Sequence, residues 1–183
     1  MEVNFKYHKA EPVQPIRIEQ VFAEKPGGGI VAAPVFDAPA TTAVGFDNGK
    51  LKLIKAYRLY EAVTSTDTTM KLIKGSGVEK GDVLATAKVG VACTAVDKTN
   101  EEYDLVTAKI GVNLEANHCL YQAKAASADA AEPLLVPSYV IGNDIVGNEG
   151  DKSVRLINGA NLRKETANIA DEVAVLLPMI NLV

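Results

Sequence analysis

Few side chains in this sequence could carry out nucleophilic catalysis. The cysteines are Cys93 and Cys119, and the histidines are His8 and His118. A cysteine nucleophile needs a histidine within hydrogen-bonding distance as its base. His118 adjoins Cys119, and neighbouring residues on a strand point to opposite faces of the sheet. His118 could reach Cys93 across a sheet, but no segment is typical of an oxyanion hole. We therefore interpret both cysteines as small buried thiols and expect no enzyme activity.

Metal and cofactor chemistry has equally little support. The sequence contains no CxxC pair, no Cys/His cluster and no GxSxG, HExxH, GxGxxG or GxxxxGK[ST] motif. Oxygen-bearing side chains gather in one glycine-rich loop, Asn143, Asp144, Asn148, Glu149 and Asp151. Their spacing matches no standard calcium loop, so we interpret them as polar turn residues. Ion binding by the loop between Asn143 and Asp151 stays open, and we expect no cofactor and no metal.

Composition narrows the class of protein. The 183 residues suffice for one domain or two small ones, and 48% hydrophobic with 23% charged residues excludes general disorder. A formal net charge of -4 argues against nucleic-acid binding. The longest strongly apolar stretch, residues 173–180, is too short to cross a bilayer, and the N-terminus has no signal-peptide pattern. We expect a soluble chain made in a cytoplasm, with no membrane contact.

The clearest structural signal is a β-hairpin. Asn48 and Gly49 tolerate the positive φ angles of a type I′ turn. With these two residues at the tip, one opposite-charge pair and two apolar pairs come into register. The pairs are Asp47 with Lys50, Phe46 with Leu51, and Val44 with Leu53.

Short alternating segments follow as far as residue 126. We expect a further strand over 57–63, strands over 69–73, 82–85 and 119–123, and a hairpin of 91–96 with 103–110 closed by the loop 97–102. This spacing predicts small β-barrel or β-sandwich modules. The fold class is therefore mainly β, with an N-terminal extended arm and one C-terminal α-helix. The expected divisions are an arm (1–30), β modules (31–126), a linker (127–137) and a β segment with the helix (138–183).

The N-terminal arm is the first candidate contact surface. Prolines and the triple glycine 27–29 separate it from the β modules. Its one strand-like segment must pair with the rest of the chain or with another subunit. The candidate contact residues are Ile16, Ile18, Val21 and Phe22.

The C-terminal segment is the second candidate surface. Residues 154–163 predict a hairpin or a bulged strand around Asn158-Gly159, and Thr166 could cap a helix running to about Leu177. One face of this helix would be apolar, and we interpret it as core or as an oligomer contact. That face comprises Ile169, Val173, Leu176, Leu177 and Ile180.

Two blocks resemble a known family. The first is Tyr-Arg-Leu-Tyr-Glu-Ala-Val at 57–63 with Asp-Thr-Thr-Met-Lys-Leu-Ile-Lys-Gly-Ser at 67–76. The second is Ile-Gly-Asn-Asp at 141–144 with Val-Arg-Leu-Ile-Asn-Gly-Ala-Asn-Leu-Arg-Lys-Glu-Thr at 154–166. Together they resemble head fiber and capsid decoration proteins of tailed bacteriophages, especially phages and prophages of gut bacteria. The resemblance implies a non-enzymatic virion protein on the capsid exterior, bound to the major capsid protein and often a homotrimer.

Two other classes of function are compatible with the sequence. A stand-alone β-sandwich module could bind carbohydrate or a cell surface, but such modules usually expose aromatic platforms. This chain has no tryptophan and only 5% aromatic residues, which counts against sugar stacking. The remaining alternative is an enzyme of unrecognised type.

Overall fold

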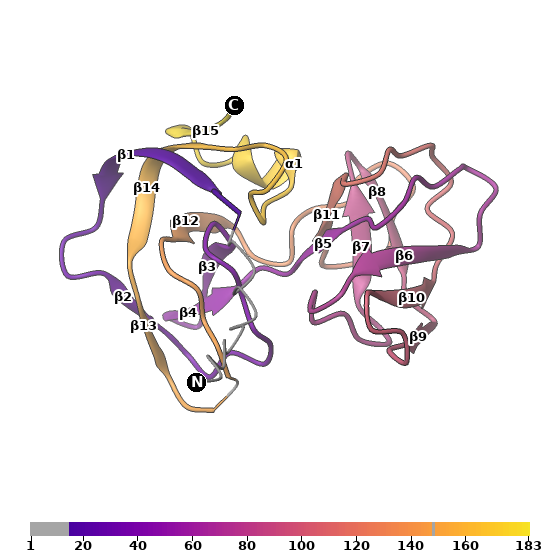
Figure 1. The fold of residues 1–183 in the computed structure, drawn as a ribbon, viewed down its shortest axis with the longest axis horizontal. Helices are drawn as coiled ribbons and strands as arrows, with labels where there is room; N and C mark the ends of the chain where they lie inside the picture. Colours follow the sequence, from indigo (N-terminus) through magenta and orange to yellow (C-terminus); the bar gives the residue numbers. More distant parts are fainter. Residues whose placement is uncertain (1–14, 148) are drawn as a thin grey trace, which may run out of the picture.

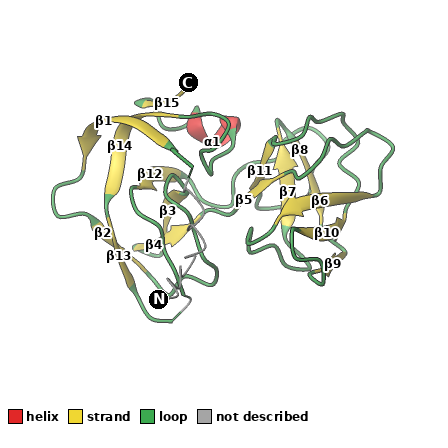
Figure 2. Cartoon of the chain, in the orientation of Figure 1, coloured by secondary structure: helices red, strands yellow, loops and turns green. Residues whose placement is uncertain are grey.

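The computed structural model describes residues 15–147 and 149–183, and its regular structure is almost entirely β-strand. Two units lie side by side (Figures 1 and 2). The terminal unit combines both ends of the described chain, whereas the central unit consists of strands β5 to β11. The predicted mainly β fold is therefore confirmed. The terminal unit contains β1 (Ile18–Glu24), β2 (Gly29–Val31), β3 (Ala43–Asp47), β4 (Lys50–Leu53), β12 (Pro137–Ile141), β13 (Lys152–Val154), β14 (Leu156–Leu162), α1 (Asp171–Ala174) and β15 (Ile180–Leu182).

The terminal unit is one curled sheet. Its strand order is β1-β14-β12-β3-β4-β2-β13, and β15 pairs in parallel with β14. β2 runs parallel to β4, and the other pairs are antiparallel. Only Arg155 separates β13 from β14, so the last strand in the order leads directly back to the second. The sheet therefore curls on itself like a small barrel.

The predicted hairpin is confirmed in register. β3 and β4 pair Val44 with Leu53, Phe46 with Leu51 and Asp47 with Lys50. The turn residues have φ angles of 50° at Asn48 and 78° at Gly49, as a type I′ turn requires. The ion pair nevertheless uses a diagonal neighbour, because Lys52 Nζ lies 2.6 Å from Asp47 Oδ2.

The central unit packs two small sheets around one apolar core. One sheet has the order β6-β10-β9 and the other β5-β11-β7-β8. Tyr57, Leu72 and Leu120, contributed by both sheets, are fully buried in that core. The strands are β5 (Ala56–Arg58), β6 (Thr69–Ile73), β7 (Val83–Thr86), β8 (Val89–Ala92), β9 (Ala95–Asp97), β10 (Tyr103–Thr107) and β11 (Cys119–Gln122).

Several predicted strands of this unit are correct, and two differ in extent. The segments 69–73, 82–85 and 119–123 appear as β6, β7 and β11. The predicted strand 91–96 is divided, because β8 pairs with β7 while β9 pairs with β10. β9 and β10 form the predicted hairpin around the loop 97–102. The predicted strand 57–63 ends at Arg58, and Leu59 makes only an isolated bridge to Leu72.

The predicted C-terminal helix is mostly wrong. α1 spans only Asp171–Ala174, and its N-cap is Ala170. Thr166 does not cap it, because its hydroxyl donates to the carbonyl of Ile16. Ile180 belongs to β15. In the described part of the chain, no helix is long and apolar enough to cross a membrane.

The other ambiguous segment of the C-terminal region is a bulged strand. β14 continues through Asn158 and Gly159 without a turn, and its register against β1 shifts at three places.

The predicted alanine-rich linker, 127–137, lies against the central unit. Ala131 donates its backbone N–H to the carbonyl of Lys88, and Ser127 forms a β-bridge with Gly90.

The N-terminal strand has its partner within the same chain. β1 pairs with β14, and the glycines that follow it form a turn into β2, which pairs with β13 and β4. The expectation that prolines and glycines isolate this strand is therefore wrong, because a distant segment supplies the pairing. Residues 1–14 of the predicted arm lie outside the described residues.

Candidate functional site

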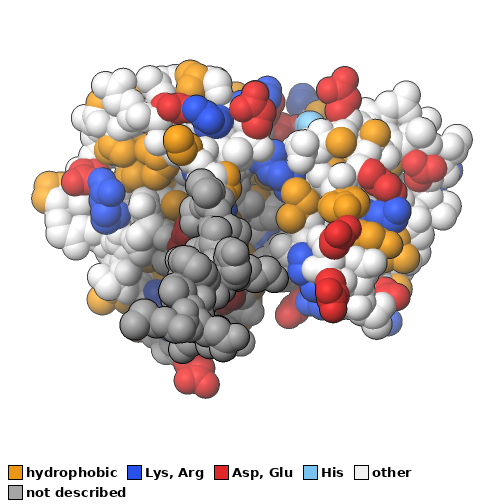
Figure 3. All heavy atoms as spheres, viewed as in Figure 1, with side chains coloured by type: hydrophobic (Ala, Val, Ile, Leu, Met, Phe, Trp, Pro, Cys, Tyr) orange, Lys and Arg blue, Asp and Glu red, His pale blue; other side chains and the backbone are white. Residues whose placement is uncertain are grey.

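The predicted contact residues of the arm fall into two groups on β1 and the residues before it. Ile18 and Val21 are half-buried and pack against the hydrophobic cluster that the two units share. Ile16 and Phe22 are exposed by 58% and 48%. Hydrophobic side chains gather over this corner of the terminal unit (Figure 3). We call Ile16 and Phe22, with the outer edge of β1, the β1 surface.

β1 is joined to its sheet by backbone pairing with β14, and two exposed ion pairs lie beside that pairing. Arg155 donates from Nη2 to Oε2 of Glu24 at 2.7 Å, and Arg163 donates from Nε to Oε1 of Glu19 at 2.5 Å. β1 is the end strand of its sheet, and among the described residues no strand pairs with its outer edge. An unpaired edge offers backbone N–H and C=O groups to another chain. The β1 surface thus combines exposed apolar side chains with a strand edge whose backbone groups are not paired with another described strand.

The predicted helix face is divided in the same way. Ile169, Val173, Leu177 and Ile180 are buried in a hydrophobic cluster that both units share, whereas Leu176 is half exposed. A second apolar surface at this end was missed by the sequence reasoning. It consists of Val175, Leu176, Met179 and Val183, and Val175 is 80% exposed. The predicted helix extended to about Leu177, which is why this surface was missed. The observed helix ends at Ala174, and the residues after it present different side chains to solvent.

Both cysteines are buried, and burial raises the pKa of each thiol, that of Cys119 to about 12. A raised pKa keeps the thiol protonated and unreactive near neutral pH. His118 does not contact them through a hydrogen bond among the described residues. Its Nε2 lies 2.9 Å from Oγ1 of Thr86. The two thiols therefore have the environment of buried structural cysteines.

The hydrogen bonds of the Thr86 hydroxyl show that His118 donates to it through Nε2–H. The Thr86 hydroxyl donates to Oε1 of Glu172 at 3.2 Å, because an ionised carboxylate can only accept. The hydroxyl has only this one hydrogen to donate, so Thr86 Oγ1 must accept the hydrogen bond that Nε2–H of His118 donates. A histidine that activates a hydroxyl nucleophile would have to accept instead. The same carboxylate also accepts the backbone N–H of Ala87, which ties α1 to the β7–β8 turn.

The acidic loop between Asn143 and Asp151 uses its side chains to hold backbone groups. Asp144 accepts the N–H of Ala40 at 2.6 Å, and Asp151 accepts that of Ala33 at 3.1 Å. Asn143 accepts the N–H of Arg155. Within residues 15–147 and 149–183, no group of three or more His, Cys, Asp or Glu side chains is placed to hold a metal ion. Asn148 and His8 lie outside the described residues.

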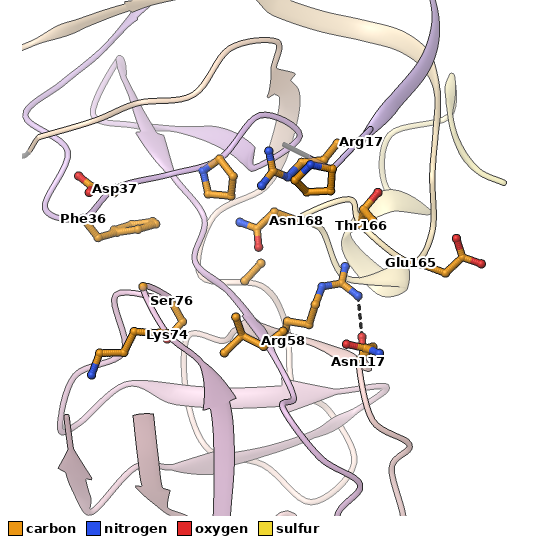
Figure 4. Close-up of a pocket in the computed structure, with 15 residues that line it drawn as sticks. Arg17, Phe36, Asp37, Arg58, Lys74, Ser76, Asn117, Glu165, Thr166 and Asn168 are labelled. Carbon is orange, nitrogen blue, oxygen red and sulfur yellow. Dashed lines mark hydrogen bonds between the residues drawn. The ribbon is translucent and has the colours of Figure 1, made fainter. Parts of the chain in front are cut away.

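A cleft of about 330 Å³ lies between the two units. Arg58 crosses its floor, donating from Nη1 to the carbonyl of Asn117 at 2.6 Å and from Nη2 to that of Ala167 (Figure 4). Arg17 and Asn168 line it from the terminal unit. No local pattern in the sequence indicates this cleft, because its residues come from segments far apart in the chain.

Comparisons with known proteins found no match to a family model, to a curated protein or to a solved structure.

Proposed function

We propose that this protein is a non-enzymatic virion structural protein, a head fiber or capsid decoration protein that attaches to the outer surface of a phage capsid. The two sequence blocks at 57–76 and 141–166 support the class. The β1 surface is the observation that carries the proposal. Exposed Ile16 and Phe22 beside an open strand edge form a contact suited to another protein.

The proposed partner is the major capsid protein. A decoration protein must stay attached through dilution, and several weak contacts on one oligomer raise the effective concentration of each contact. We therefore propose a homotrimer that presents three β1 surfaces. Light scattering at micromolar concentration tests this point. A species of about three times 19.4 kDa supports the trimer, whereas a monomer at every concentration contradicts it.

The attachment surface can be tested without removing β1. Deleting residues 1–29 would take β1 and its ion pairs out of the sheet, so point variants are the better probe. Ile16→Ser with Phe22→Ser should fold normally and lose co-sedimentation with capsids of the phage that encodes the chain. The control is Val136→Ser with Val146→Ser, at residues 73% and 76% exposed. Equal loss in both variants, or no loss in the first, contradicts the proposal.

A second candidate function is carbohydrate binding, and one observation favours it. The rings of Tyr60 and Tyr103 lie 5.3 Å apart, and Tyr60 is 42% exposed. Lys71 Nζ lies 5.0 Å from the Tyr103 ring centroid. Paired aromatic rings can stack against a sugar. Binding of soluble polysaccharides that Tyr60→Ala abolishes would support this candidate, and absence of binding by the unaltered chain would exclude it for the sugars tested.

A further inference from the structure

The cleft between the units brings cationic side chains from distant segments together. The terminal unit contributes Arg17 and Asn168, and the central unit contributes Arg58 and Ser76. Figure 4 shows Arg17 on the upper rim and Arg58 below it, with Asn168 between them. Ligand sites commonly lie between packed units, where a few polar groups converge.

Arg17 has more donors than partners. Its side chain is only 19% exposed, and its nearest carboxylate oxygen is Asp144 Oδ1, 3.7 Å from Nη1. Among the described residues, its guanidinium makes no closer ion pair and no hydrogen bond. A guanidinium has five N–H donors, and a largely buried one is costly unless acceptors satisfy them. Arg17 therefore has donors free for an anionic acceptor.

Arg58 adds a second guanidinium to the lining of the cleft. Arg58 bonds to two carbonyl oxygens, and within the described chain no carboxylate pairs with it. Lys74 contributes little, because its ammonium lies 2.8 Å from Asp104 Oδ1 and points away from the cleft. Two carboxylates line the cleft as well. That of Glu165 points away (Figure 4), and that of Asp37 accepts the backbone N–H of Gly147 at the rim.

A hydroxyl in the lining also lacks a partner. Oγ of Ser76 is buried and makes no hydrogen bond within the described residues. Buried polar groups in native proteins are nearly always hydrogen-bonded, so one without a partner needs an explanation. Ser76 also lines the cleft, so a rotation about its χ1 torsion would bring this hydroxyl to a ligand oxygen there.

We propose that this cleft binds an oxyanion, a carboxylate or a phosphate group. Arg17 donates charge-assisted hydrogen bonds to it, Ser76 donates its hydroxyl, and the uncompensated charge of Arg58 attracts it. The inference is independent of capsid attachment, because the cleft and the β1 surface share none of these side chains.

The test is a titration of the full-length, isotope-labelled protein by NMR, with acetate and inorganic phosphate as separate probes. Chloride keeps the ionic strength constant, so that general screening does not mimic binding. We expect saturable shifts of the backbone N–H signals of Arg17, Ser76 and Asn168. Saturation by acetate alone identifies a carboxylate site, and saturation by phosphate alone identifies a phosphate site. Absence of saturation up to about 100 mM of either anion would overturn the proposal.

Variants separate this site from general cation effects. Arg17→Gln should weaken binding about ten-fold, since a hydrogen bond to a charged group is lost. The matched control is Arg163→Gln, whose guanidinium is 41% exposed and pairs with Glu19 on the same sheet. The control should bind like the unaltered protein. Ser76→Ala should weaken binding without affecting the fold. Equal affinity in the unaltered protein and in both Arg17→Gln and Ser76→Ala would also overturn the proposal.

Discussion

The ring of Phe22 on β1 covers Gly159 on β14. A Cβ at residue 159 would lie 2.9 Å from two ring carbons and 2.9 Å from Cβ of Ala23. Glycine is thus needed at this position for the close approach of another strand rather than for a positive φ angle. The β1 surface and the strand that supports it therefore depend on each other.

Gly159→Ala should displace Phe22 and weaken the pairing of β1 with β14. We expect a loss of about 1–3 kcal/mol in the free energy of unfolding, measured by urea denaturation. Combining it with Phe22→Ala should cost less than the sum of the two single changes, because the shortened side chain relieves the clash. Gly49→Ala is the control. It introduces strain at φ 78° in open space and should show no coupling to Phe22.

Val173 in α1 and Val175 just after its last residue provide a matched pair. Val173 is 1% exposed, whereas Val175 is 80% exposed. Val173→Asp should destabilise the protein by about 3 kcal/mol or more, because it buries a carboxylate without a partner. Val175→Asp should change the free energy of unfolding by less than about 0.5 kcal/mol. Similar losses in the two variants would show that this segment packs differently.

The ion pair of Lys55 with Asp82 should matter far more than the exposed pairs. Lys55 Nζ lies 2.9 Å from Asp82 Oδ2, and the two side chains are only 7% and 11% exposed. Asp82 also accepts from the Tyr57 hydroxyl and from Gln122. Asp82→Ala leaves Lys55 buried without its partner and should cost about 3–5 kcal/mol.

The control for this prediction is an exposed ion pair. Glu132→Ala removes the partner of Lys124, and these side chains are 73% and 53% exposed. It should cost less than about 1 kcal/mol in urea denaturation. A loss as small as this in Asp82→Ala would mean that the Lys55–Asp82 pair is hydrated and does not anchor the central unit.

Tyr57 should make the protein sensitive to alkali. Burial, and then the neighbouring carboxylate of Asp82, raise the pKa of its hydroxyl far above the ordinary value of 10.0. The hydroxyl stays protonated in the folded state but ionises in the unfolded state above pH 10. Its contribution to stability is therefore complete below pH 10 and is lost as the pH rises further, by up to about 1.4 kcal/mol per pH unit.

Tyr57→Phe tests this dependence. At neutral pH it should cost about 1 kcal/mol, because one hydrogen bond to Asp82 is lost. Between pH 10 and 11 its free energy of unfolding should fall less steeply than that of the unaltered protein. Tyr139→Phe serves as the control for removing a hydroxyl elsewhere. Parallel pH profiles for Tyr57→Phe and the unaltered protein would contradict the prediction.

Local signals in the sequence predicted local structure well. The β3–β4 hairpin was predictable in register, because two turn residues and the pairs beside them lie within ten positions. The pairing of the N-terminal strand β1 was not predictable, because its partner β14 is distant in sequence. Glu24 and Arg155, whose ion pair lies beside that pairing, are 131 residues apart. The apolar pattern of 16–22 shows that a partner is needed but does not say which segment provides it.

The C-terminal error has a related cause. Apolar residues at helical spacing between 169 and 180 predict a helix, yet four of these five side chains are buried from a short helix, a turn and a strand. Tertiary packing here outweighs helical periodicity, and Pro178 prevents a longer helix. The cleft was unpredictable for the same reason, because Arg17 and Arg58 come together only through the docking of the two units.

Attachment of the β1 surface to a capsid can be tested by photo-crosslinking from within that surface. Phe22 would be replaced by the photoreactive residue p-benzoylphenylalanine, which keeps an aromatic ring at this position. The matched probe is the same residue at Val136, which is 73% exposed. We expect irradiation of protein bound to capsids to link residue 22, but not residue 136, to the major capsid protein. Crosslinking from residue 136 alone, or from neither position on capsids that carry the protein, would contradict it.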